Sequence, residues 1–141
     1  MALAIDRRLI VQGDKLRLTP LEVEAVFIVK WKDFAGYVSS LSLHNADELE
    51  EYTDLLKLPG VVLFDDVGQG GFTPRVAAEF LGVLDARYEN GYLTAATLQG
   101  PASEMFETAK KKGAEVYRAV NGALRRLAEE INGVPALEVQ F

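Results

Sequence analysis

Two adjacent aspartates stand directly before a glycine-rich loop near the middle of the chain. Carboxylate oxygens are the ligands that Mg²⁺ prefers in proteins. A glycine-rich loop between a strand and a helix offers free backbone N–H groups to an anion. The pattern therefore predicts a site for a magnesium-bound nucleotide or phosphorylated metabolite, with the aspartates as metal ligands. Its residues are Asp65, Asp66, Gly68, Gly70, Gly71 and Thr73.

A structural role is the simpler interpretation of the same stretch, and the sequence favours it. The glycines can supply positive φ angles in a solvated turn, and Asp65 or Asp66 can close an Asx-turn. No lysine follows the glycines as it does in a P-loop. Two carboxylates also repel a phosphate unless a metal ion lies between them. The sequence therefore requires no cofactor, and Mg²⁺ is the one that the aspartates would accommodate.

The run VVLFDDVGQGG, residues 61–71, resembles the first motif of class I methyltransferases. In that family an acidic residue and a Gly-x-Gly loop follow the first strand. The resemblance is confined to this stretch. Beyond it the chain departs from the family, because no strand ending in an acid follows the next helix and too few residues remain for the family's sheet.

A second group of residues has the composition of a nucleic-acid contact. Trp31, Phe34 and Tyr37 are interleaved with Lys30 and Lys32, and aromatic rings beside lysines can stack on bases. The chain carries 15 basic and 21 acidic residues, a net charge of −6, whereas nucleic-acid-binding domains usually show a basic surface. We therefore expect no nucleic-acid partner and interpret these residues as the turn of a β-hairpin.

The composition excludes several other functions. The chain has no cysteine, which excludes thiolate catalysis, disulfides and cysteine-based zinc sites. Its 141 residues predict one domain, residues 1–141. The opening residues place Asp6, Arg7 and Arg8 inside a short apolar stretch, unlike a signal peptide. No apolar run reaches membrane-spanning length, so we expect a soluble, cytoplasmic protein with no membrane partner.

Strand-like segments dominate residues 1–44. In residues 9–18, apolar residues alternate with others on either side of a Gly-Asp turn, which predicts a hairpin. Residues 23–31 are dense in β-branched and aromatic side chains and predict a central strand. Residues 37–43 predict the strand that returns after the next turn. This order of segments predicts antiparallel pairing.

Helices and strands alternate over residues 45–141. The helix boundaries are marked by N-caps, by proline at a first helical position and by glycine after a last turn. The expected order is a helix from Asn45 to Pro59, a strand at 61–64, a helix from Thr73 to Asn90, a strand at 92–98, a helical region at 101–131 and a strand at 136–141.

The last helical region has an apolar stripe at steps of three or four residues. One continuous helix over residues 101–131 would measure roughly 46 Å, more than the diameter of about 37 Å expected for a compact domain of this length. The helix must therefore break, with Asn121-Gly122 as the expected point, or project and pack on a second chain. The stripe consists of Phe106, Val116, Val120, Leu124, Leu127 and Ile131.

Together these elements predict an α+β fold. We expect a mostly antiparallel sheet of about four to six strands, with helices on one face and a long C-terminal helix, continuous or broken. The favoured function is a non-enzymatic interaction, accessory or assembly domain that forms a homo-oligomer through the long helix and the terminal strand. The alternative is a small magnesium-dependent nucleotide- or phosphometabolite-binding domain or enzyme that uses the Asp65-Asp66 loop.

Overall fold

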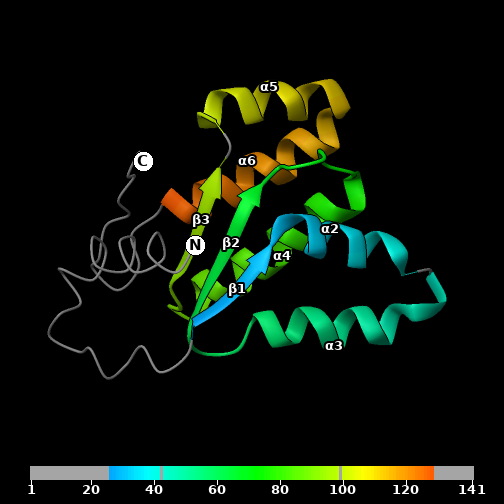
Figure 1. Ribbon diagram of the computed structural model, residues 1–141, viewed down its shortest axis with the longest axis vertical. Coiled ribbons are helices and arrows are strands. Elements are labelled where there is room, and N and C mark those ends of the chain that lie inside the picture. Colours follow the sequence, from blue (N-terminus) through cyan, green and yellow to red (C-terminus); the bar gives the residue numbers. More distant parts are fainter. Residues whose placement is uncertain (1–25, 42, 99, 129–141) are drawn as a thin grey trace, which may run out of the picture.

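The computed structural model describes residues 26–41, 43–98 and 100–128, and its centre is a parallel sheet (Figure 1). β1 (Val26–Lys30), β2 (Val61–Val67) and β3 (Thr94–Leu98) lie side by side in that order, and both pairings are parallel. The helices are α2 (Trp31–Ser40), α3 (Ala46–Leu56), α4 (Pro74–Glu89), α5 (Ala102–Lys112) and α6 (Ala114–Ala128), with a 3-10 turn at Leu43–Asn45.

The prediction of a mostly antiparallel sheet of about four to six strands is wrong, because the described sheet has three strands and both of its pairings are parallel. The returning strand expected at 37–43 is absent from the described part, where residues 31–40 form α2. Trp31, Phe34 and Val38 recur at helical spacing, and all three are fully buried. Burial of this stripe outweighs local β-propensity. Residues 23–43, which were expected to form two antiparallel strands, instead contain β1 and the first helix of a crossover to the parallel strand β2.

Predictions for the middle of the chain are confirmed. α3 begins directly after Asn45, although the Asn45 side chain makes no capping hydrogen bond. The Thr73 hydroxyl caps α4 by accepting a hydrogen bond from the Val76 N–H at 3.2 Å. β2 and β3 fall where strands were expected, and β2 extends through both aspartates to Val67.

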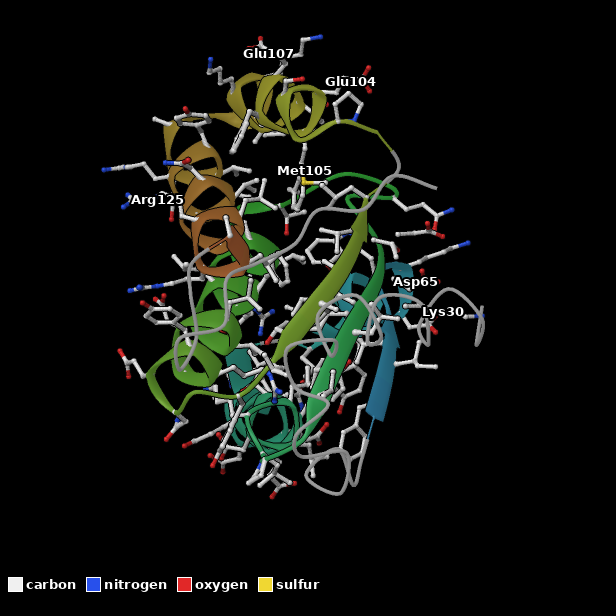
Figure 2. All side chains as sticks on the ribbon, turned by 90° about the vertical axis from the view of Figure 1, so that its left-hand side faces the viewer. Lys30, Asp65, Glu104, Met105, Glu107 and Arg125 are labelled. Atoms are coloured by element: carbon white, nitrogen blue, oxygen red, sulfur yellow. The ribbon has the colours of Figure 1, made fainter. Side chains whose placement is uncertain are left out.

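The two faces of the sheet have different neighbours. Val62 and Phe64 of β2 belong to the main core, which includes side chains from α2, α3, α4 and α6. Figure 2 shows α4 and α6 together on one side of the strands. Because side chains alternate along a strand, Leu63 and Asp65 point to the opposite face, where Leu63 forms a separate small cluster with Ala95.

The C-terminal helical region is broken, and the break is not at the expected point. α5 ends at Gly113, which has φ 121° and ψ 165°, a conformation that only glycine adopts readily. Gly122 instead lies inside α6. A Cβ atom on Gly122 would lie only 3.0 Å from Leu81 Cδ1 of α4, so this glycine allows α6 to pack closely on α4.

A buried arginine joins the loops at the amino ends of the strands. Arg87 of α4 is 0% exposed, and its five N–H groups all donate hydrogen bonds. Burial lowers the pKa of Arg87 to about 10, an effect that the nearby Tyr92 partly offsets. The acceptors are the Thr94 hydroxyl and the carbonyl oxygens of Leu56, Leu58, Gly60 and Leu93.

Some predictions fall outside the described residues. These are the hairpin at 9–18, the strand at 136–141 and the last residue of the apolar stripe, Ile131. Within the described ranges, no helix is both long enough and apolar enough to cross a membrane.

Candidate functional site at the carboxyl ends of the strands

The two aspartates lie where β2 ends. Asp65 is 6% exposed, which is low for a carboxylate. Its Cα partner in β1 is Lys30, the last residue of that strand. Paired residues of parallel strands point to the same face, and Figure 2 shows both side chains at the same edge of the sheet. The fold therefore places a lysine beside the buried carboxylate.

Thr97 of β3 connects the two aspartates. Its hydroxyl donates a hydrogen bond to Asp65 Oδ1 at 2.7 Å and accepts one from the Asp66 N–H at 2.7 Å. Asp66 has φ 55°, and it is the only residue other than glycine with a positive φ in the described part of the chain. The register between β2 and β3 shifts at this point. The shared hydroxyl thus stabilises a left-handed residue at the end of the strand.

The glycine-rich loop is a chain of tight turns. Gly68, Gly70 and Gly71 all have φ angles between 82° and 93°, as the sequence predicted for these glycines. Two of the loop's N–H groups are used internally: Gln69 donates to the Asp66 carbonyl and Gly71 to the Gly68 carbonyl. Among the described residues, the N–H groups of Gly70 and Phe72 have no such acceptor. Gly70 is exposed and Phe72 is buried, so the Gly70 N–H is the one open to an anion.

The aromatic core holds the loop in place. The indole N–H of Trp31 donates to the Gly71 carbonyl at 3.4 Å, and the Trp31 ring lies 5.2 Å from the Phe72 ring in an edge-to-face contact. Trp31 also packs on Phe34 and Phe80. Since Trp31 is 0% exposed, the loop is tied directly to the centre of the protein.

α5 lies across the same edge (Figure 1). A Cβ atom on Gly68 would lie 3.2 Å from Met105 Cε, and one on Gly71 would lie 4.0 Å from Lys112 Cε. In Figure 2 the Met105 side chain points from α5 toward the sheet. The loop thus has a lysine beside it, although none follows the glycines in the sequence.

This arrangement combines acceptors, donors and positive charge within one edge of the sheet. Open α/β sheets bind their ligands beyond the carboxyl ends of the strands. The predicted ligand residues run from Asp65, near the carboxyl end of β2, to Thr73, directly before α4. Within the described ranges, no group of three or more acidic or histidine side chains could hold a metal ion. A magnesium ion on Asp65 and Asp66 would therefore need water and ligand oxygens to complete its coordination.

The side chains of the apolar stripe are mostly interior. Val116 and Val120 are 0% exposed and belong to the main core. Leu124 and Leu127 are partly buried against that core. Phe106 lies 6.2 Å from the Tyr117 ring, so it joins α5 to α6. The described members of the stripe therefore pack within the chain.

The aromatic residues that resembled a nucleic-acid contact are placed differently from the expectation. Trp31 and Phe34 are fully buried and cannot stack on bases. Tyr37 is 39% exposed, and its ring packs against Tyr52 at 4.5 Å. The expected turn of a hairpin is also wrong, because these residues lie on one helix.

Sequence reasoning missed three residues of the site: Lys30, Thr97 and Lys112. Lys30 and Thr97 could have been found from the rule that parallel strands present their carboxyl ends at one edge, had the strands been recognised as parallel. Lys112 carries no such signal, because its position depends on how α5 returns over the sheet.

Comparison with known proteins adds no assignment to this geometry. A scan against protein-family models found no match, and searches of curated proteins and of solved structures found no significant match.

Proposed function

We propose that the carboxyl edge of the sheet binds a phosphate-bearing metabolite or nucleotide together with Mg²⁺. In this proposal Asp65 and Asp66 face the metal ion, while the Gly70 N–H and the first turn of α4 face the phosphate. Helix N-termini favour anions through free N–H groups and the helix dipole. The proposal concerns binding and assigns no reaction to the site.

The left-handed conformation of Asp66 is the observation that supports this function most. A residue other than glycine in this region costs of order 1–3 kcal/mol, and such residues cluster at functional sites. Glycine would adopt the same turn more readily, and asparagine would adopt it without the charge. An aspartate at this position gains nothing structural from its charge, since within the described residues its carboxylate has no hydrogen-bond or ion-pair partner. A ligand that binds the Asp66 carboxylate would explain why a charged residue occupies this position.

The charges at this edge suit a metal-bound anion better than a free one. Asp65 and Asp66 would repel a bare phosphate, whereas Mg²⁺ between the carboxylates and the phosphate reverses that repulsion. Lys30 and Lys112 add positive charge on either side. We therefore expect binding to depend on Mg²⁺.

Thermal unfolding with ATP, ADP or inorganic phosphate, each with and without MgCl₂, tests this function. A bound ligand at 100 times its Kd stabilises the folded protein by about 2.7 kcal/mol, so the midpoint should rise. Asp66→Asn should abolish the rise, because asparagine retains the turn but not the charge. Glu51→Gln is the matched control, since it makes the same charge change at an exposed position on α3. No rise for any probe, or an equal rise in Asp66→Asn, contradicts the proposal.

Self-association is a second candidate, and one observation favours it. Phe27 and Ile28 of β1 are each 47% exposed, and β1 pairs only with β2 among the described strands. Exposed apolar residues on an edge strand form a surface suited to pairing with a second copy. Sedimentation velocity at several protein concentrations tests this function, with Ile28→Lys as the variant that should remain monomeric. A wild-type monomer at every concentration would exclude it.

A further inference from the structure

We propose that α5 is a lid over the carboxyl edge and that its closure brings Lys112 to the bound anion. This inference rests on the proposed function, because it assigns to that site a moving part and a further binding residue. It differs from the proposed function in what it requires: α5 must open independently of the rest of the fold, and one particular lysine must contribute to affinity.

α5 is anchored mainly to α6 and buries few of its own side chains. Ala109 is its only buried side chain among those described. Its main packing partner is α6, through contacts such as Phe106 on Tyr117. Segments with few buried apolar contacts open with free energies well below that of global unfolding. In the proposed opening, α5 breaks these contacts with α6 and leaves the sheet edge, while α4 and α6 remain packed.

The closed position is defined by two contacts at opposite ends of α5. Near its beginning, Met105 covers Gly68, and at its end Lys112 approaches Gly71. These glycines bracket Gly70, whose N–H is assigned to the anion. Closure would thus cover the loop with an apolar side chain at one end and place a cation at the other, which excludes water and strengthens the electrostatic attraction.

Gly113 provides the hinge. Its φ of 121° lies in a region that other residues rarely adopt, and a Cβ atom there would meet nothing within 4 Å. The chain at this position is therefore set by backbone conformation rather than by packing. Hinges in domain and lid closure are a few residues that absorb changes in φ and ψ. Gly113 also directly follows Lys112, so rotation there moves the lysine toward or away from the loop.

Lys112 is the lysine of its run that is placed to bind. Lys110 pairs with Glu107 at 3.2 Å and lies 5.4 Å from the centre of the Tyr117 ring, so its charge is engaged on α5 and α6. Lys112 makes no hydrogen bond or ion pair with another residue in the described ranges. Lys111 is exposed and has the same charge, which makes it the matched control.

Amide hydrogen exchange of the free protein tests the lid without any ligand. We expect the amides of α5 to exchange at least about tenfold faster than those of α4, because they open locally rather than by global unfolding. Exchange of both helices at the same rate, set by global unfolding, would overturn the lid.

Titration calorimetry with ATP and MgCl₂ tests the role of Lys112. Lys112→Gln should weaken binding by about tenfold, the loss of one charge-assisted contact, and MgATP should slow exchange in α5 of the wild type. Lys111→Gln should bind as the wild type does. Equal affinities of Lys112→Gln and Lys111→Gln, with Asp66→Asn inactive, would overturn the lysine's role and leave the proposed site standing. If the wild type binds none of the probes, both the proposed site and the role of Lys112 are wrong. The mobility of α5 is tested separately, because its fast exchange in the free protein does not depend on a ligand.

Discussion

At the scale of single residues, the candidate site depends on one hydroxyl group that the sequence did not single out. The Thr97 hydroxyl donates a hydrogen bond to the Asp65 carboxylate and accepts one from the Asp66 N–H. The aspartates and glycines could be predicted because their types are unusual together. Thr97 could have been predicted only after the strands were recognised as parallel. Lys112 could not, since it reaches the loop from more than thirty residues away through the packing of α5.

Thr97→Val should destabilise the protein by about 3 kcal/mol. The substitution keeps the shape but leaves the buried Asp65 carboxylate and the Asp66 N–H without their partner, and an unsatisfied buried charged group costs more than a neutral one. Urea unfolding followed by the fluorescence of Trp31 measures the change.

The control for this prediction is Thr108→Val on α5, where the exposed hydroxyl donates to the Glu104 carbonyl within one helix. We expect a change within about 0.5 kcal/mol there. Thr97→Ser, which keeps the hydroxyl, should recover most of the loss. Equal effects of Thr97→Val and Thr108→Val would show that the bridge contributes little.

Tyr52 should make stability depend on alkaline pH. Burial raises the pKa of Tyr52 above 10.0, with smaller contributions from Asp33 and Tyr37. The folded protein then holds this proton at a pH where the unfolded chain has lost it, so the stabilisation is present below pH 10 and declines as pH rises through the folded pKa. Tyr52→Phe should flatten this decline in urea-unfolding free energies. Identical pH profiles of the two proteins would contradict the prediction.

At the scale of secondary-structure elements, the boundaries of α3 and α4 could be predicted from the sequence, whereas the helical period of residues 31–40 was misjudged. Thr73, Pro74 and the Asn90-Gly91 stop act locally, so their effect can be read from neighbouring residues. Residues 31–40 carry both a strand-like composition and a helical stripe, and the choice between them is made by burial against α4 and β2. Choosing the strand also made the sheet antiparallel, because a helix at this point is what allows the next strand to be parallel.

The glycines within helices should respond oppositely to the same substitution. Gly36→Ala in α2 should stabilise the protein by about 0.5–1 kcal/mol, because alanine favours the helix and its Cβ would meet nothing within 4 Å. Gly122→Ala in α6 should destabilise it by about 1–3 kcal/mol, since the Cβ would press on Leu81 at 3.0 Å.

Thermal and urea unfolding of these two variants measure the difference. Gly122→Ala combined with Leu81→Ala should recover part of the loss, because the second change removes the atoms that obstruct the first. A stabilising Gly122→Ala would mean that α4 and α6 are not held at this close distance.

At the scale of the whole molecule, opposite ends of the sheet have different roles. At the carboxyl ends of the strands lie an aspartate and three glycines with positive φ, together with α5, which buries few side chains. The amino ends are joined by Arg87, whose donors are all satisfied. Stability concentrated at one end allows strain to be carried at the other.

Arg87→Met should destabilise the protein by about 3 kcal/mol or more, because the buried carbonyl oxygens that Arg87 serves lose their donor. The stability of Arg87→Lys should lie between those of the wild type and Arg87→Met, since an ammonium has fewer donors than a guanidinium. Arg118→Met, at an exposed position of α6, is the control and should change the free energy by less than about 0.5 kcal/mol.

Urea unfolding of the three variants at neutral pH provides the comparison. Ligand binding at the carboxyl edge should persist in Arg87→Lys, because that edge lies at the other ends of the strands. If Arg87→Met and Arg118→Met have the same free energy of unfolding, the prediction is wrong, and water satisfies the carbonyl oxygens as well as the guanidinium does.

The strand order β1-β2-β3 has a consequence for how the chain assembles on the ribosome. Among the described strands, β2 pairs with β1 and β3 pairs with β2, so the first pairing can form before β3 is synthesised. Each pairing nevertheless joins residues more than thirty positions apart, such as Val26 with Val61 and Val62 with Thr94, and parallel pairing over such separations forms slowly. We expect the first two strands and their connecting helices to dock while the third is still being translated, with α6 sealing the core last.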